Sequence, residues 1–217
     1  KVMEAIEIIL SRKFVKHLMT FEKITPSIMA PQGYDAGSKE LLFDQEKYDS
    51  ETKTWREKPS YLGAHERYRG MISISQKDKS GYVSIHVEHM SPVFAKEFLE
   101  LIIRETNVLL RNKDIEESSE ALEYLKSELS NTSLVEIRSS INALIEQQLQ
   151  TQMLAQINED YVLMEIEPPF IPEKKSKPSR FIICIIGTML GGMLSLAIVS
   201  IRYYLLGGKE KNNLASI

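Results

Sequence analysis

The sequence predicts an α+β protein with a membrane-proximal α/β base, a long helical hairpin projecting from it, and a C-terminal transmembrane helix. Three observations support this prediction. Residues 71–87 have the composition of a β-hairpin, residues 93–158 keep helical periodicity without Gly or Pro, and residues 181–201 carry no charge. Strands and helices differ in period, 2 against 3.6 residues, and about 20 apolar residues span a bilayer.

The N-terminal part of the predicted base begins with a helix. Val2–Met19 places its apolar residues on one broad helical face, so we expect a single helix over this range. Pro and Gly residues between positions 26 and 37 break any long helix, and residues 25–59 are expected to be irregular or to form short elements. The apolar face of the expected helix consists of Ile6, Ile9, Leu10, Phe14, Val15 and Leu18.

A β-hairpin is predicted at the end of the base, which spans residues 1–90. Met71–Ser75 and Tyr82–Val87 are rich in β-branched and apolar residues, and the connection between them is charged and contains turn formers. Apolar and polar side chains alternate in the second segment, which predicts one packed and one solvated face. His86 and His89 are three residues apart, so they would face opposite sides of a strand and would not share a metal ion.

Two long helices are predicted for residues 91–158, the helical extension. Ser91 is a favoured N-cap, and Pro92 fits the first helical position because its missing N–H has no partner there. Helical periodicity continues up to an interruption at residues 130–133 and resumes over Leu134–Ile157. The interruption predicts that the second helix returns along the first as a hairpin.

Residues 159–180 are predicted to lead the chain back to the membrane. Tyr161–Ile166 has the composition of one more strand, which we expect to pair with the hairpin and to place that sheet near the bilayer. The next segment cannot be helical, because proline lacks a backbone N–H and restricts the residue before it. This proline-rich membrane entry contains Pro168, Pro169, Pro172 and Pro178.

Phe181–Ile201 is the core of a predicted transmembrane helix over residues 181–204. Its 21 residues carry no charge, and at about 1.5 Å per residue they span roughly 30 Å, the thickness of the hydrocarbon layer. Soluble core helices are rarely apolar on every face over this length. Basic residues flank both ends in nearly equal number, so charge alone does not orient the helix or place the tail at 205–217.

Gly187 and Gly191 form a G-x-x-x-G pattern in the predicted membrane helix, with Gly192 beside them. Small residues let two helix backbones approach closely in lipid, which predicts a helix-packing face. The alternative is that glycine is simply common in membrane helices. Met193 and Leu194 stand where a phosphate-binding loop requires Lys and Ser or Thr, so we predict no nucleotide loop.

The charge distribution argues against nucleic acid as a partner. Residues 1–173 contain 20 Lys and Arg against 29 Asp and Glu, whereas residues 174–217 contain 7 Lys and Arg and one Glu. An acidic domain repels phosphates. Cys184 is the only cysteine, so no disulfide or cysteine-rich metal site forms within the chain. No catalytic constellation stands out, and we expect no enzymatic activity, cofactor or metal.

Four short motifs carry a resemblance to a known family. The most specific is the proline-rich entry into an apolar segment with glycines at 187, 191 and 192. Over about residues 1–206 the sequence resembles the chain-length determinant family, also called the class 1 polysaccharide co-polymerases. The four motifs are Val87-Glu88-His89 with Ser91-Pro92, Leu144–Gln148, Met153–Ala155, and Pro172–Pro178.

The resemblance implies a non-enzymatic regulator that sets the length of O-antigen or a related surface polymer. Members of the family form ring-like homo-oligomers and act with a separate membrane-bound polymerase that uses lipid-linked oligosaccharide. Two membrane helices enclose their periplasmic domain. The resemblance therefore implies a bacterial inner-membrane protein with residues 1–180 in the periplasm and residues 205–217 in the cytoplasm. The family's first membrane helix and the start of its periplasmic domain have no counterpart here.

Two other functions stay open from the sequence. One is a co-polymerase subunit for capsule or exopolysaccharide export that works with a separate tyrosine kinase. The other is a sugar-active enzyme, which would need acidic residues around a pocket. We also expect self-association, because the two long helices carry more apolar positions than a two-helix hairpin can bury internally.

Overall fold

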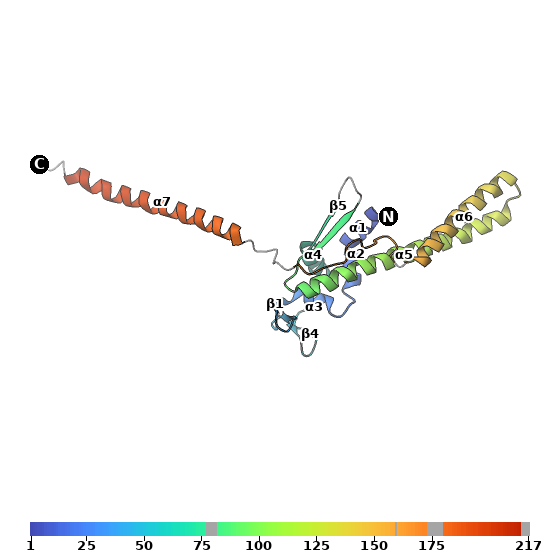
Figure 1. Ribbon diagram of the computed structural model, residues 1–217, viewed down its shortest axis with the longest axis horizontal. Coiled ribbons are helices and arrows are strands. Elements are labelled where there is room, and N and C mark those ends of the chain that lie inside the picture. Colours follow the sequence, from blue (N-terminus) through green and yellow to red (C-terminus); the bar gives the residue numbers. More distant parts are fainter. Residues whose placement is uncertain (77–81, 159, 173–179, 214–217) are drawn as a thin grey trace. The chain divides into compact units, whose positions relative to one another are not determined.

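The structure, a computed structural model, describes the backbone of residues 1–76, 82–158, 160–172 and 180–213. The chain divides into two units, Lys1–Ile171 and Pro172–Ile217 (Figure 1). The first is mixed helix and sheet, and the second is built on one apolar helix. In chain order the elements are α1 Val2–Leu10, α2 Arg12–Leu18, α3 Ile24–Met29, β1 Pro31–Asp35, β2 Glu40–Phe43, β3 Tyr48–Asp49, β4 Thr54–Trp55, α4 Tyr61–Met71, β5 Ile72–Gln76, β6 Val83–Val87, α5 Pro92–Asn131, α6 Val135–Ile157 and α7 Arg180–Asn213.

The prediction of a single helix over residues 2–19 is wrong, because the helix is interrupted at Ser11. Ser11 adopts an extended conformation, with φ −79° and ψ 151°. Its side chain accepts a hydrogen bond from the Phe14 N–H at 3.1 Å, so it acts as the N-cap of a new helix, α2. The apolar periodicity continues across the break, since Ile9 on α1 and Phe14 and Leu18 on α2 are all buried.

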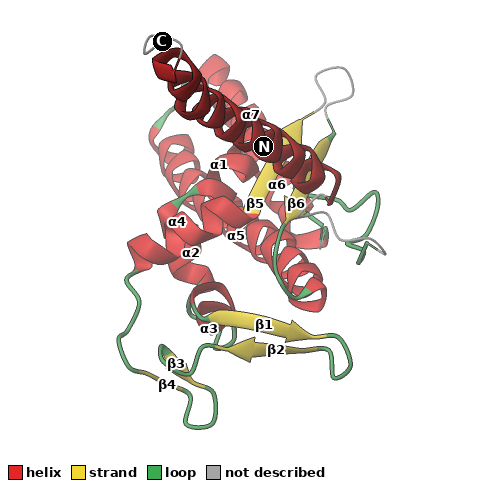
Figure 2. Ribbon diagram, turned by 90° about the vertical axis from the view of Figure 1, so that its left-hand side faces the viewer, coloured by secondary structure: helices red, strands yellow, loops and turns green. Residues whose placement is uncertain are grey.

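Short elements occupy residues 25–59, as predicted. The hairpins β1–β2 and β3–β4 are separate two-stranded antiparallel sheets. Figure 2 shows the β1–β2 hairpin beside α3. The turn of the β3–β4 hairpin contains Lys53 in the left-handed region, with φ 55°.

The β-hairpin predicted near residues 71–87 is confirmed as β5 and β6. The two strands are antiparallel, with Ile74 opposite Ile85 and Ile72 opposite Val87. A two-stranded sheet is marginal by itself and needs packing against a helix. That packing is present, because Ile72 belongs to the main core and the side chain of Ile85 lies against it.

The main core joins the first four helices to β5 and to the N-terminal half of α5. Phe98 is completely buried and stacks on Phe94, with ring centroids 5.2 Å apart. The Tyr68 ring of α4 lies nearly perpendicular to the Phe98 ring, and its hydroxyl donates to the Ile9 carbonyl at 2.9 Å. The hydroxyl is therefore satisfied although the side chain is fully buried. The core members are Ile9, Phe14, Val15, Leu18, Ile24, Ile28, Ala64, Tyr68, Ile72, Phe94, Phe98, Leu101 and Ile102.

The two long helices begin and end close to the predicted positions. Ser91 accepts a hydrogen bond from the Phe94 N–H at 3.1 Å, and Pro92 occupies the first turn, which confirms the predicted start of α5. Beyond Asn131 the chain turns, and α6 packs alongside the C-terminal half of α5 (Figure 1). Arg138 of α6 donates to the carbonyls of Leu129 and Thr132, so it satisfies acceptors left free where α5 ends.

The prediction of a strand at Tyr161–Ile166 is wrong, because this segment is irregular and pairs with neither β5 nor β6. Its backbone is held by a side chain instead. The Asn107 side-chain oxygen of α5 accepts from the N–H groups of Val162 and Leu163, at 3.0 and 2.8 Å. The Asn107 amide donates to the Leu163 carbonyl at 2.9 Å. These bonds take the place of a sheet ladder.

The predicted apolar helix near the C-terminus is present as α7. Cys184–Arg202 is long and apolar enough to cross a membrane, and none of it is buried inside the structure. A core helix of a soluble protein would be mostly buried, so the lack of burial supports a membrane helix. Thr188 and Ser195 donate their hydroxyls to carbonyls of the same helix. This satisfies polar groups that lipid could not.

Candidate functional site

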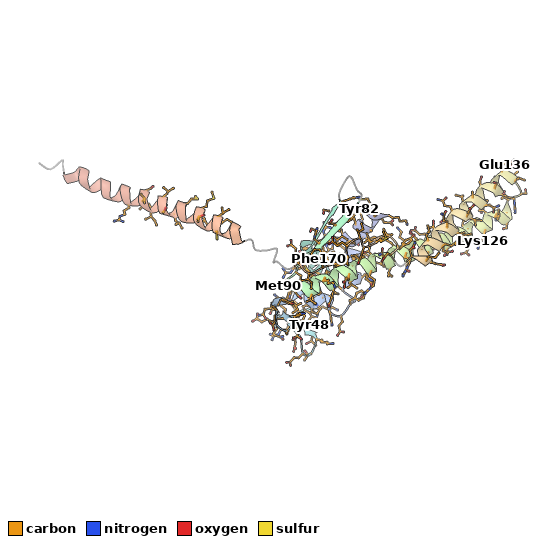
Figure 3. The ribbon with its side chains drawn as sticks, in the orientation of Figure 1. Tyr48, Tyr82, Met90, Lys126, Glu136 and Phe170 are labelled. Carbon is orange, nitrogen blue, oxygen red and sulfur yellow. The ribbon has the colours of Figure 1, made fainter. Side chains whose placement is uncertain are left out.

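The second half of α6 presents apolar side chains to solvent. Leu149, Met153 and Ile157 are 43%, 59% and 72% exposed. Because they are four residues apart, they lie in one row on the same helix face. We call this row the α6 stripe. Figure 3 shows the turn beyond it, marked by Lys126 of α5 and Glu136 of α6.

Few side chains hold α6 against α5. Of the 23 residues of α6, Ile141 and Ala155 are the buried ones. One polar contact supplements them, since the Gln152 amide donates to the Ser119 hydroxyl of α5 at 2.8 Å. An amphipathic helix normally buries a broad apolar face. The α6 stripe is therefore apolar surface that the described residues of the first unit leave exposed, which is typical of an interaction site.

The glycines of α7 form a second candidate surface. A Cβ atom placed on Gly187, Gly191 or Gly192 would meet no atom of the described chain within 4 Å. Packing among the described residues of the second unit therefore does not explain why these positions are glycine. The predicted helix-packing role of the three glycines stays a prediction, and the structure adds that their face is open.

A polar row on α5 anchors the segment that follows α6. Asp114 is 4% exposed and accepts hydrogen bonds from the Lys1 ammonium group and the Tyr161 hydroxyl. Burial alone would raise the pKa of Asp114, but these two hydrogen bonds outweigh it and hold the pKa below its ordinary value. Burial, and then the bond to Asp114, raises the pKa of Tyr161 to about 12. Asn107 and Asp114 are seven residues apart and thus share one face of α5.

His89 links two elements of the base. Its Nδ1 accepts a hydrogen bond from the Ser91 N–H at 3.1 Å, so its Nε2 must carry the proton donated to the Ser27 carbonyl at 2.9 Å. The ring also lies 4.5 Å from the Phe94 ring. Burial lowers the pKa of His89, against the opposing effect of its backbone bonds. The neutral ring therefore joins α3 to the N-terminus of α5, and the Val87–Pro92 motif has a structural role.

The proline-rich membrane entry is only partly described. Pro168 and Pro172 are exposed, Pro169 is half-buried, and all three lie in irregular backbone. Pro178 lies outside the described residues. Beside these prolines, Ile166 and Phe170 are each 68% exposed. The segment approaching the apolar helix thus presents further apolar side chains to solvent.

No group of three or more His, Cys, Asp or Glu side chains that could hold a metal ion occurs within the described part of the chain. His89 is occupied by backbone bonds, and His86 is exposed on β6. The His17 ring bonds Glu105 at 2.8 Å and so forms an ordinary pair between α2 and α5.

The sequence analysis missed the polar row of α5. A signal was present, because Asp114 and Ser118 stand at four-residue spacing between the apolar residues Leu110 and Leu122, on one face of the helix. Between Ile102 and Leu122 most of the buried residues are polar: Glu105, Thr106, Asn107, Asp114 and Ser118. Buried polar groups require partners, so polar residues on an otherwise apolar face predict a specific contact even where the partner is unknown.

Comparisons with known proteins do not assign the chain to a family. No family model matches the sequence, and no curated protein matches it significantly.

Proposed function

We propose that this chain is a non-enzymatic regulator of polysaccharide chain length, anchored in the bacterial inner membrane with its larger unit in the periplasm. It acts beside a membrane-bound polymerase on lipid-linked polysaccharide. The observation that carries the proposal is a unit of mixed helix and sheet in which α6 leaves an apolar stripe exposed, in a chain that also has a helix long and apolar enough to span a membrane. The family resemblance of the sequence supplies the class of polymer, which is O-antigen or a related surface polysaccharide.

The α6 stripe supports assembly from several copies. In this proposal α5 and α6 form a hairpin that projects from a membrane-proximal base, and the stripe of one copy packs against its neighbour in a ring. Three large apolar side chains in one row are enough to form the buried centre of such a contact. The flanking glutamines, among them Gln150 and Gln156, are exposed and suit its polar rim.

The glycine face of α7 supports a contact inside the bilayer. Lipid tails are as apolar as leucine, so helices associate in membranes through close packing and not through a hydrophobic effect. An open face with Gly187 and Gly191 allows that close approach. The partner helix belongs to the polymerase or to another copy of the regulator.

Deletion of the gene in its host tests the function directly. The surface polysaccharide is then separated by length on a gel. A regulator predicts loss of the dominant length cluster while polymer is still made. Loss of all polymer would instead indicate an enzyme, and an unchanged length distribution would contradict the proposal.

Complementation of the deletion strain with Met153→Glu tests the α6 stripe. A charge in the centre of an apolar contact costs several-fold in affinity, so we expect weaker self-association by sedimentation in detergent and a shifted length cluster. Gln147→Glu adds the same charge at an exposed position of α6 on a different helix face and is the matched control. Identical behaviour of the two variants would exclude the stripe from the assembly.

Replacing Gly187 and Gly191 together with Leu tests the glycine face. Leucine favours the bilayer at least as well as glycine, so insertion should survive, whereas the new side chains hold a partner helix away. We expect normal protein levels and an altered polysaccharide length. Met189→Leu with Met193→Leu changes two exposed residues at the same spacing and should behave like the parent. A parental length distribution in the glycine variant would show that these glycines face lipid.

A further inference from the structure

A hollow on the base contains no residue of either candidate surface and has no role so far. Its volume is about 240 Å³, below the usual size of a pocket for a drug-sized ligand. It therefore has room for one ligand of about the size of a monosaccharide and not for a longer segment of a polymer. The connection from α2 to α3 and the first turn of α3 form one side, and the β3–β4 hairpin with the loop after it forms the other. Its lining residues are Met19, Glu22, Thr25, Pro26, Tyr48, Lys53, Trp55, Lys58 and Pro59.

An aromatic row gives the hollow a rigid wall. The Tyr48 ring lies 4.9 Å from the Trp55 ring and 5.6 Å from the Phe43 ring. Tyr48, labelled in Figure 3, is only 7% exposed, whereas Trp55 is half-buried and keeps part of its surface free. The indole is thus fixed from behind and presented to the hollow. A fixed aromatic surface of this kind suits a flat ligand with an apolar face.

The charged side chains that line the hollow carry one net positive charge. Lys53 and Glu22, which are 31 residues apart in the sequence, form an ion pair of 2.7 Å across the hollow. Lys53 adopts its left-handed backbone conformation there, which is unfavourable for a residue other than glycine. Lys58 also lines the hollow and has no carboxylate partner within the described residues. The remaining charge favours an anionic ligand.

We propose that this hollow binds one carboxylate-bearing sugar unit, stacked on Trp55 with its carboxylate held by Lys58. A pyranose ring combines an apolar C–H face with a rim of hydroxyls, which matches an aromatic wall beside Lys and Glu side chains. Lys53 and Glu22, which neutralise each other, are placed to donate to and accept from hydroxyl groups. That the sugar belongs to a growing polysaccharide rests on the proposed function, whereas the binding itself does not.

The single tryptophan of the chain allows a direct test. The full chain in detergent is titrated with an oligosaccharide that contains glucuronate, and Trp55 fluorescence is followed. The neutral control is the oligosaccharide of equal length with glucose in place of glucuronate. We expect a saturable change with the acidic sugar and weaker binding of the neutral one. Equal affinity for both would overturn the proposal, as would a flat titration.

Two lysine variants locate the contact. Lys58→Gln should weaken binding of the acidic sugar about tenfold, the usual worth of one charge-assisted hydrogen bond. Lys39→Gln removes an exposed lysine on the β1–β2 turn, outside the hollow, and should bind like the parent. Circular dichroism establishes that each variant is folded. Equal affinities of the two variants would overturn the assignment of Lys58.

Calorimetry measures binding without fluorescence, so it shows whether Trp55 contributes to binding the sugar or only reports that the sugar is bound. Trp55→Ala should lose binding, and Trp55→Phe should retain part of it. A folded Trp55→Ala variant with parental affinity would overturn the stacking role. The site and the function fail separately, since a protein that sets polymer length but gives no Trp55 response retains its function and lacks this site. A protein that binds the sugar but does not affect polymer length lacks the function and retains the site.

Discussion

The base and the α5–α6 extension differ in how many of their apolar side chains they bury. In the base, the first 11 residues of α5 bury Phe94, Phe98, Leu101 and Ile102 against four other helices and β5. In the extension, the 23 residues of α6 bury two side chains, Ile141 and Ala155. The base therefore buries its apolar side chains, while α6 leaves apolar side chains exposed. Substitutions in the two regions should affect stability very differently.

Truncation in the base should have the largest effect. Phe98→Ala removes a fully buried ring between Phe94 and Tyr68, and such cavities cost about 3–5 kcal/mol. We expect a matching loss in the free energy of unfolding, measured by urea denaturation in a mild detergent. Phe170→Ala deletes a ring that is 68% exposed and should change stability by less than about 0.5 kcal/mol. Similar losses for both variants would contradict the description of the core.

Loss of the Asn107 anchor should have the next largest effect. Asn107→Ala leaves the N–H groups of Val162 and Leu163 without their acceptor, which costs about 1–3 kcal/mol. Amide hydrogen exchange at residues 162 and 163 should accelerate more than exchange in the core. Asn142→Ala, at an exposed position of α6, is the control and should change neither measurement. Unchanged exchange in the Asn107 variant would show that the segment has another support.

Acidification should weaken the base through His89. Its pKa is lowered in the folded protein, so its contribution to stability is complete above its ordinary pKa of about 6.5 and is lost as the pH falls through the lowered value. We expect the unfolding temperature to drop between pH 7.5 and 5. His89→Gln should flatten this dependence, whereas His86→Gln, on the exposed face of β6, should preserve it. A slope that survives in His89→Gln would assign the effect to other groups.

Truncation on the α6 stripe should have the smallest effect on folding. Met153→Ala removes a side chain that is 59% exposed, and surface substitutions of this kind usually change stability by less than about 0.5 kcal/mol. Urea denaturation at low protein concentration measures the effect on the monomer. A loss comparable to that of Phe98→Ala would mean that the stripe is part of the core.

Local sequence signals predicted the elements whose structure is decided locally. The β5–β6 hairpin follows from two apolar segments around a polar connection, and the start of α5 follows from Ser91 before Pro92. The break between α1 and α2 also has a local cause, the N-cap Ser11, but the apolar periodicity that continues across it predicts one unbroken helix. The candidate glycines of α7 were found by spacing alone, and their open face is consistent with that prediction without testing it.

The sequence by itself determined the apolar helix α7, the helices α5 and α6, and the β5–β6 hairpin, because each is specified by the period and capping of neighbouring residues. Only the tertiary structure decided where the segment at residues 161–166 goes. Its composition favours a strand, but its backbone groups bond to Asn107, which is more than 50 residues earlier in the chain. The hollow at Trp55 also depends on the tertiary structure, since Glu22 and Lys53 form their ion pair only when the chain folds. A local pattern specifies what an element is, whereas contacts between distant residues determine what it touches.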